Sequence, residues 1–155
     1  MNEIVIERPG YPRLVINHLF LDFTGTLSRD GKLIEGVADR LQTISTAIKI
    51  TVLTADTFGT AANELAGLPV ELEKITSGGE KDLRVMEAGE DKTAAIGNGM
   101  NDVLMVKRAA LGIAVIGPEG AAGELLKVAG VVVTDIRDGL DLLIHPRRLT
   151  ATLRA

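Results

Sequence analysis

Short apolar segments alternate with segments of helical periodicity along most of the chain, and this alternation constrains the fold more than any other feature. "IKITVLT" (48–54) is almost continuously apolar, as expected of a strand that is covered on both faces. In the segment before it (36–47), Val37, Leu41 and Ile44 recur at helical spacing on one face. Strands that alternate with helices of about ten residues predict a parallel sheet with helices on both faces.

The rest of the sequence continues this pattern without a linker or repeat, so we predict a single three-layer, Rossmann-like α/β domain over residues 1–155. At the start, "EIVIER" (3–8) and "RLVINHLFLDF" (13–23) flank the turn signal "PGYP". They predict a β-hairpin whose second arm continues into the central strand. We expect the basic C-terminal segment (145–155) to be a solvated tail or an oligomer contact. Further strands are predicted at 69–75, 92–98, 111–117 and 130–135, and helices at 59–67, 79–89, 101–110, 119–129 and 136–144.

Composition narrows the range of functions. Aromatic residues make up 3% of the chain and the net charge is −4, whereas nucleic-acid binding needs stacking side chains and clustered positive charge. Cysteine is absent, which excludes disulfides and thiolate metal sites and fits a reducing compartment. No segment approaches the roughly 20 apolar residues that span a bilayer. We therefore expect a cytoplasmic protein with neither a nucleic-acid nor a membrane partner.

Several polar groups fall where predicted strands end or the next helix begins. Asp22 ends "HLFLD", Thr54 ends "ITVLT", and Asn98 and Asp102 lie just after another strand, with Lys81 opening the helix before it. Ligands of open parallel sheets bind at the carboxyl ends of the strands, so we expect these groups to share one pocket. Taken singly, each is better explained by a structural role, as a turn acid, a helix-entry hydroxyl, a helix cap or a solvated lysine. Their joint occurrence in this order is what indicates a reaction site.

The same groups suit the handling of a phosphoryl group. Asp22 can attack phosphorus to give an aspartyl phosphate. Backbone N–H groups of the turn 23–27 can cradle the anionic oxygens, and Gly25 lets the backbone approach closely. The Thr54 hydroxyl and the Lys81 charge can bind further phosphoryl oxygens. The predicted catalytic residues are Asp22, Thr24, Thr54 and Lys81, and the predicted phosphate-binding residues are Phe23, Gly25, Thr26, Thr54, Ala55 and Lys81.

A magnesium ion is the expected cofactor. Mg²⁺ prefers oxygen ligands and usually retains water, and it would screen the repulsion between a carboxylate and an anionic substrate. The predicted ligands are Asp22, the carbonyl of Thr24, Asn98 and Asp102.

This order of motifs resembles the haloacid-dehalogenase superfamily of phosphatases and phosphotransferases, over roughly residues 15–135. The resemblance implies a motif lysine, for which Lys81 is the best-placed candidate and Lys74 and Lys92 are weaker ones. It also implies the aspartate nucleophile at Asp22. The matching elements, in chain order, are "DFTGTL" (22–27), Thr54, Lys81 and "GNGMND" (97–102).

Within the superfamily, these motifs are most similar to the phosphorylation domain of P-type ATPases, whose first motif reads Asp-Lys-Thr-Gly-Thr-Leu. Only 26 residues separate Leu27 from Thr54, so a pump's ATP-binding domain does not fit there, nor does a cap domain. Ion pumping is thereby excluded. The resemblance implies an open, capless site that acts on a large substrate or is closed by a neighbour in a dimer or tetramer. The segments 3–20 and 28–36 could make such contacts, or be edge strands and surface turns.

Two positions depart from the family pattern. Most phosphatases of the superfamily have a second acid where this chain has Thr24, and general acid–base catalysis is typically worth about 10²–10⁴-fold. The metal-ligand aspartate of the fourth motif is Asn98, which removes a negative charge and should weaken Mg²⁺ binding. Asp102 is the candidate to compensate, and we expect aspartate at position 98 to bind Mg²⁺ more tightly.

Two functions follow as alternatives. The first is a Mg²⁺-dependent phosphomonoesterase or phosphotransferase that forms an aspartyl phosphate on Asp22 and turns over slowly because of Thr24. Its substrate would be a phosphorylated small molecule or macromolecule. The second is a regulatory module that retains the phosphate and Mg²⁺ site with little or no turnover. Carbon–halogen hydrolysis would need a halide pocket and usually a cap, and is the least expected.

Overall fold

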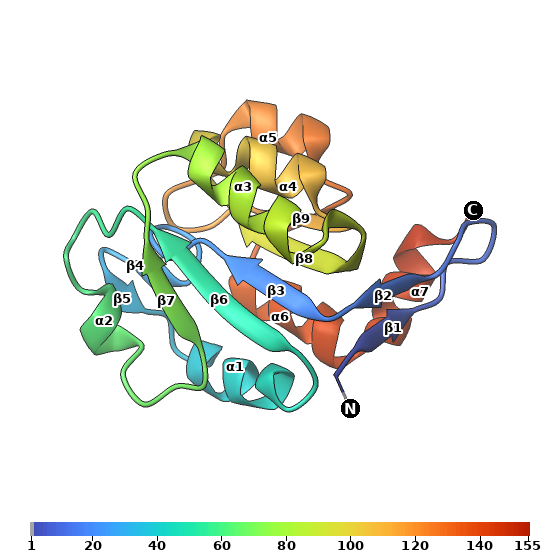
Figure 1. Ribbon diagram of the computed structural model, residues 1–155, viewed down its shortest axis with the longest axis horizontal. Helices are drawn as coiled ribbons and strands as arrows, with labels where there is room; N and C mark the ends of the chain where they lie inside the picture. Colours follow the sequence, from blue (N-terminus) through green and yellow to red (C-terminus); the bar gives the residue numbers. More distant parts are fainter. Residues whose placement is uncertain (1) are drawn as a thin grey trace.

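A parallel β-sheet forms the centre of the molecule. The computed structural model describes residues 2–155, and within them the sheet has six strands in the order β10-β9-β8-β3-β6-β7, all parallel (Figure 1). The predicted three-layer architecture is thus confirmed. The strands are β3 (His18–Leu21), β6 (Lys49–Thr54), β7 (Glu71–Lys74), β8 (Thr93–Gly97), β9 (Leu111–Val115) and β10 (Val131–Val133).

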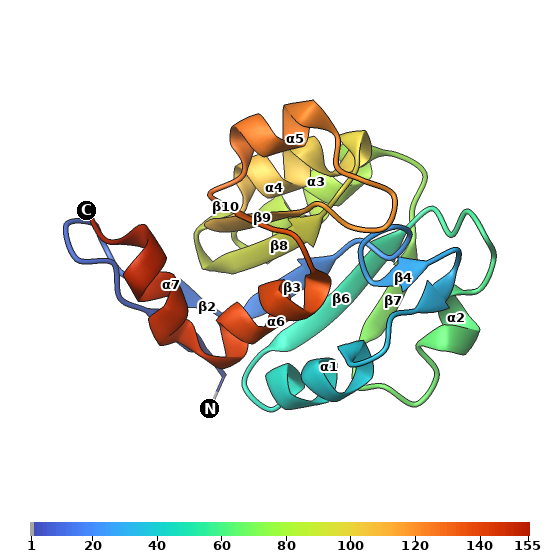
Figure 2. The same cartoon turned by 180° about the vertical axis from the view of Figure 1, so that it is seen from behind.

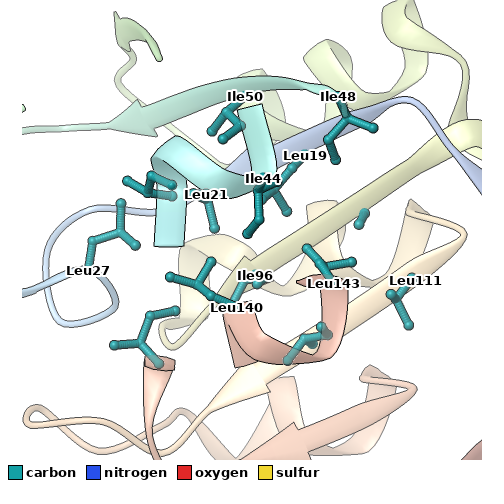
Figure 3. Close-up of a cluster of buried hydrophobic side chains, with 14 of the residues drawn as sticks. Leu19, Leu21, Leu27, Ile44, Ile48, Ile50, Ile96, Leu111, Leu140 and Leu143 are labelled. Carbon is teal, nitrogen blue, oxygen red and sulfur yellow. The ribbon is translucent and has the colours of Figure 1, made fainter. Parts of the chain in front are cut away.

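Helices cover both faces of the sheet because successive strand residues point to opposite sides. One face packs against α3 (Gly78–Ala88), α4 (Val103–Arg108) and α5 (Gly123–Val128), and the other against α1 (Val37–Ser45) and α6 (Ile136–Ile144) (Figures 1 and 2). In β3, Leu19 and Leu21 belong to the core on the α1–α6 face, whereas Phe20 lies in the core on the other face. Figure 3 shows Leu19 and Leu21 beside Ile44 of α1 and Leu140 of α6.

The N-terminal hairpin is also present, and it projects beyond the sheet (Figure 2). Its strands, β1 (Ile4–Ile6) and β2 (Leu14–Ile16), pair antiparallel, and the second arm passes through Asn17 into β3. The C-terminal segment is not a solvated tail but largely the helix α7 (Pro146–Leu153), and its alternative role as an oligomer contact stays a prediction. Proline at its first turn suits a helix start, and Leu149 is completely buried in the core that contains the hairpin.

Two predicted helices are shorter than expected. The helix expected at 119–129 begins only at Gly123, because residues 117–120 form a tight turn closed by the Gly120 N–H on the Gly117 carbonyl at 2.9 Å. The helix expected at 59–67 is the single turn α2 (Ala61–Glu64). Between Leu27 and β6, besides α1, lies a small hairpin of β4 (Ser28–Arg29) and β5 (Lys32–Leu33). Residues 2–155 contain no cap domain.

The sheet topology places the site. From the central strand β3 the chain builds β6 and β7 on one side and then crosses back to start β8 on the other. The carboxyl ends of β6, β3 and β8 are therefore neighbours around the switch point at which α/β sheets bind ligands. Among the described helices, none combines the length and apolar character needed to cross a bilayer.

Candidate active site at the carboxyl ends of β3, β6 and β8

Asp22 is held in a fixed position immediately after β3. Its N–H donates to the Ile96 carbonyl of β8 at 3.0 Å, which continues the sheet pairing by one residue. One carboxylate oxygen, Oδ1, accepts from Lys81 Nζ at 2.9 Å, and the other, Oδ2, accepts from Thr26 Oγ1 at 3.0 Å. The residue is 5% exposed. Asp22 therefore presents a preorganised carboxylate at the end of the central strand.

Lys81 lies in the first turns of α3, the helix that Ser77 caps through its hydroxyl on the Glu80 N–H. Its ammonium group bridges Asp22 and Asp102, with a distance of 2.7 Å to Asp102 Oδ1. Burial alone would lower the pKa of Lys81, but the two carboxylates outweigh burial and the pKa is raised. Lys81 is thus a fully buried cation. The other two candidate lysines, Lys74 and Lys92, are exposed.

The nucleophile candidate Asp22 is costly to ionise where it sits. Burial is the largest effect, the charge of Asp102 adds to it, and together they raise the pKa of Asp22 to about 7. Lys81 and the Thr26 hydroxyl oppose this rise. A further positive charge near Asp22 would therefore increase its ionised fraction.

Asp102 has a different place from the one expected. It is completely buried, and while Oδ1 binds Lys81, Oδ2 accepts the N–H groups of Asn98 and Gly99, each at 3.0 Å. A Cβ on Gly97 would come within 2.4 Å of Asp102 Cγ, so the side chain lies directly over that glycine. Both oxygens are engaged inside the protein, and Asp102 does not line the cleft. It fixes the loop after β8 and orients Lys81.

The Asn98 amide is oriented by its two partners. The nitrogen donates to the Gly120 carbonyl at 3.2 Å, so the oxygen must face the other way, where it accepts from Thr26 Oγ1 at 3.1 Å. The single proton of that hydroxyl lies within reach of both this oxygen and Asp22 Oδ2, which is 3.0 Å away. An amide oxygen and a carboxylate oxygen thus lie on either side of Thr26.

The turn after Asp22 uses some of the donors that we had expected to bind phosphate. The Phe23 carbonyl accepts the N–H groups of Thr26, Leu27 and Ser28 at 3.2, 3.0 and 3.1 Å, so these donors close the turn. The Phe23 side chain is completely buried in the core. Thr24 Oγ1 is the one buried side-chain polar atom within residues 2–155 that lacks a hydrogen-bond partner. A buried hydroxyl without a partner marks a place where a ligand or water would be stabilised.

A cleft of about 190 Å³ opens above these groups. Thr54 ends β6 at its edge, and its Oγ1 accepts the Asp56 N–H at 2.8 Å, which leaves the hydroxyl proton for a ligand. Of the predicted residues, Asp22, Thr24, Thr54, Ala55 and Asn98 line the cleft, whereas Phe23, Gly25, Thr26, Lys81 and Asp102 do not. The cleft is also lined by Thr57, Gly99, Asn101 and Glu119, which we did not predict.

Thr57, Gly99 and Asn101 lie within or beside recognised motifs, so closeness in sequence was a usable signal for them. Glu119 carried one weaker signal. It follows β9, and the carboxyl-end rule applies to that strand as well.

Comparisons with known proteins concern the family and the fold of the chain. No family model matches the chain. The uncharacterized protein MJ0073 of Methanocaldococcus jannaschii is 44% identical to it over 92 residues, which are 56% of this chain and 99% of that protein.

Several solved structures are similar. The 3-deoxy-D-manno-octulosonate 8-phosphate phosphatase of Moraxella catarrhalis, in complex with magnesium, phosphate and KDO, superposes with a TM-score of 0.66 at 19% identity, covering 88% of this chain and 90% of that one. The cobalt-bound deoxy-D-mannose-octulosonate 8-phosphate phosphatase of Haemophilus influenzae gives a TM-score of 0.69 at 16% identity, covering 88% and 92%. A zinc-transporting PIB-type ATPase gives 0.63 at 25% identity, covering 77% of this chain but 20% of the ATPase.

Proposed function

From the premise that this chain belongs to the same family as MJ0073 and has the haloacid-dehalogenase-like fold, we propose that it is a phosphohydrolase or phosphotransferase that forms an aspartyl phosphate on Asp22. Its substrate is a phosphorylated small molecule or macromolecule. The solved phosphatases with this fold support the reaction class. The cytoplasmic location and the absence of nucleic-acid and membrane partners stay predictions.

One observation carries the proposal. The Asp22 carboxylate lines an open cleft. Its two oxygens accept hydrogen bonds from Lys81 and Thr26, which do not line the cleft, at 2.9 and 3.0 Å. A carboxylate with a structural role would be enclosed on all sides, as Asp102 is. Asp22 instead combines a fixed orientation with access for a substrate, which is what a nucleophile requires.

The formation of the aspartyl phosphate needs no proton donor when the leaving group is a weak base. A carboxylate oxygen of Asp22 attacks phosphorus, the bond from phosphorus to the leaving oxygen breaks, and that oxygen departs as an anion. With acetyl phosphate the leaving group is acetate. In the second step water attacks phosphorus, which returns the carboxylate and releases phosphate. Thr24 cannot act as an acid or base near neutral pH, so we expect the second step to be slow.

A divalent cation, which we propose to be Mg²⁺, fits the donor set. The cleft offers oxygen donors from Asp22 and Asn98, and the Thr24 residue beside them has an orphaned hydroxyl. No group of three or more His, Cys, Asp or Glu side chains suited to a metal occurs within residues 2–155. Mg²⁺ is commonly held by one or two carboxylates together with water and substrate phosphate. Such an ion supplies charge neutralisation at the phosphoryl oxygens. Asp22, the Thr24 carbonyl and Asn98 would hold it.

Acetyl phosphate labelling tests the proposal. We expect treatment of the protein with acetyl phosphate and Mg²⁺ to give an acid-stable, hydroxylamine-labile adduct that mass spectrometry maps to Asp22. The adduct should be absent in D22N and unchanged in D91N, which removes an exposed carboxylate. An adduct on another residue, or none on the wild type, would contradict the assignment of the nucleophile.

A regulatory module with the same site is the second candidate, and the neutral residues Thr24 and Asn98 favour it. Such a protein would bind phosphate and Mg²⁺ but release little product. A panel of phosphorylated small molecules with Mg²⁺ separates the two candidates. Turnover that is lost in D22N supports the enzyme, whereas no turnover in either protein supports the module.

A further inference from the structure

Glu119 is the second acidic residue of the cleft. Asp22 and Glu119 are the two carboxylates within the described residues that line it. The glutamate sits in the turn after β9, is exposed, and forms no hydrogen bond or ion pair with residues 2–155. Its charge is therefore not neutralised by a neighbouring side chain in the described part of the chain.

The turn that carries Glu119 is fastened to Asn98 by two hydrogen bonds just after the glutamate. The Asn98 amide donates to the Gly120 carbonyl at 3.2 Å, and the Ala122 N–H donates to the Asn98 carbonyl at 2.8 Å. The turn itself is closed by the bond between Gly120 and Gly117. Although Glu119 is exposed, its backbone is thus placed by Asn98, whose side-chain oxygen contacts the Thr26 hydroxyl that also contacts Asp22.

Gly25 provides the close approach between Glu119 and the Asp22 turn. A Cβ at Gly25 would lie 3.0 Å from Glu119 Cδ and Oε1 and 2.8 Å from Asn98 Nδ2. The backbone there has φ +78°, a conformation that glycine adopts readily. The carboxylate of Glu119 consequently lies over the turn between Thr24 and Thr26, on the side where the Asn98 amide nitrogen also approaches Gly25.

We propose that Glu119 is the second anionic ligand, directly or through water, of the divalent cation in this cleft, in place of the acid that Asn98 does not provide. The inference rests on the proposed function for the existence of that cation. The charges of the site support it, because Asp102 is fully engaged by Lys81 and two N–H groups and is thereby unavailable. With Glu119 the site has two carboxylates, a number that suits Mg²⁺.

Cation binding can be measured without turnover. We would titrate Mg²⁺ by calorimetry and Mn²⁺ by electron paramagnetic resonance into the wild type, E119Q and the control E124Q. Glu124 is an exposed glutamate outside the cleft that pairs with Lys127. We expect E119Q to weaken binding by about tenfold or more and E124Q to change it by less than about twofold, since affinity for hard cations follows ligand charge. Thermal melts would verify that all three proteins are folded.

A charge-rescue variant strengthens the test. N98D alone should tighten binding, and N98D/E119Q should recover most of the affinity that E119Q loses. Equal affinities of E119Q and the wild type would overturn the inference and leave the nucleophile proposal standing. Lost turnover in E119Q with unchanged cation affinity would also overturn it. A wild type that binds neither ion would overturn both this inference and the metal-dependent part of the proposed function. Labelling of Asp22 by acetyl phosphate tests the nucleophile separately from cation binding.

Discussion

The buried ion-pair group of Lys81, Asp22 and Asp102 makes a sharp prediction about stability. The Lys81 side chain is 1% exposed and contacts the two carboxylates at 2.9 and 2.7 Å. K81M keeps most of the apolar volume but leaves two neighbouring carboxylates without their cation. Breaking a buried pair by removing one partner costs about 3–5 kcal/mol, so we expect a loss of that size in the free energy of unfolding at pH 7.5.

The pH dependence sets a bound on this cost. A stranded carboxylate can escape its penalty by binding a proton. For Asp22, whose pKa is already about 7 with Lys81 in place, this escape limits its share of the loss to about 0.8 kcal/mol at pH 7.5 and to almost nothing at pH 5.0, where the carboxyl is already protonated. Without Lys81 the folded-state pKa of Asp22 rises further, and a raised acid pKa destabilises the folded state increasingly as pH rises above the unfolded pKa. The loss in K81M should therefore be smaller at pH 5.0, by about 1 kcal/mol.

Urea denaturation at the two pH values measures both effects. K127M is the control, because Lys127 forms an exposed ion pair with Glu124. Its replacement should lower the free energy of unfolding by less than about 0.5 kcal/mol. The double variant K81M/D102N should be more stable than K81M at pH 7.5, since it removes one of the two stranded charges. A K81M protein as stable as K127M, or one whose loss is the same at both pH values, would refute the reasoning.

Two further predictions concern the turn and the nucleophile. In chemical denaturation, the free energy of unfolding of G25A should be lower than that of the wild type by about 1–3 kcal/mol, and G25A should also bind Mn²⁺ more weakly, because the added methyl group meets Asn98 and Glu119. The control is G59A, where φ is +68° and no atom lies within 4 Å of the added methyl group. It should show only the cost of placing alanine at a positive φ. Equal losses in the two variants would argue against the close approach. In EDTA, the pKa of Asp22 near 7 makes wild-type stability fall as pH rises from about 4 to 7, since the folded state then holds more protons than the unfolded state. The melting temperature of D22N should therefore exceed that of the wild type by more at pH 8 than at pH 5, and a pH-independent difference would contradict the raised pKa.

The fold was largely predictable because its information is local. A buried parallel strand must be apolar on both faces, and a helix that covers it must repeat its apolar residues with helical spacing, so β6 and α1 can be recognised from sequence alone. The helix α7 could not be recognised in this way. Leu149 is its one fully buried residue, and its burial depends on the hairpin at the other end of the chain.

The candidate site was predictable where a motif residue lies at the end of a predicted strand, because the strand then fixes the place of that residue in the fold. Asp22, Thr54 and Asn98 follow neighbouring strands, and the structure brings them to one cleft together with the buried Lys81. The place of Asp102 beneath the cleft was not predictable, because a carboxylate in the fourth motif can face a ligand or the backbone. Glu119 was missed for a related reason. Its turn is directed by hydrogen bonds to Asn98, a residue in the loop after another strand, and no local pattern encodes that contact.

The charges of the site connect these inferences. When ionised, Asp22 and Asp102 exceed the single charge of Lys81 by one, and Glu119 adds another negative charge at the cleft. A phosphorylated substrate is itself anionic, so its approach is opposed unless a cation is present, and at partial burial such repulsion is screened less than in bulk water. The same cation would favour the ionised form of Asp22, whose raised pKa otherwise keeps part of the protein unreactive at neutral pH. On this reasoning a bound cation would favour both the approach of the substrate and the reactive form of Asp22, and Glu119, proposed as a ligand of that cation, would also influence how much of the protein can react.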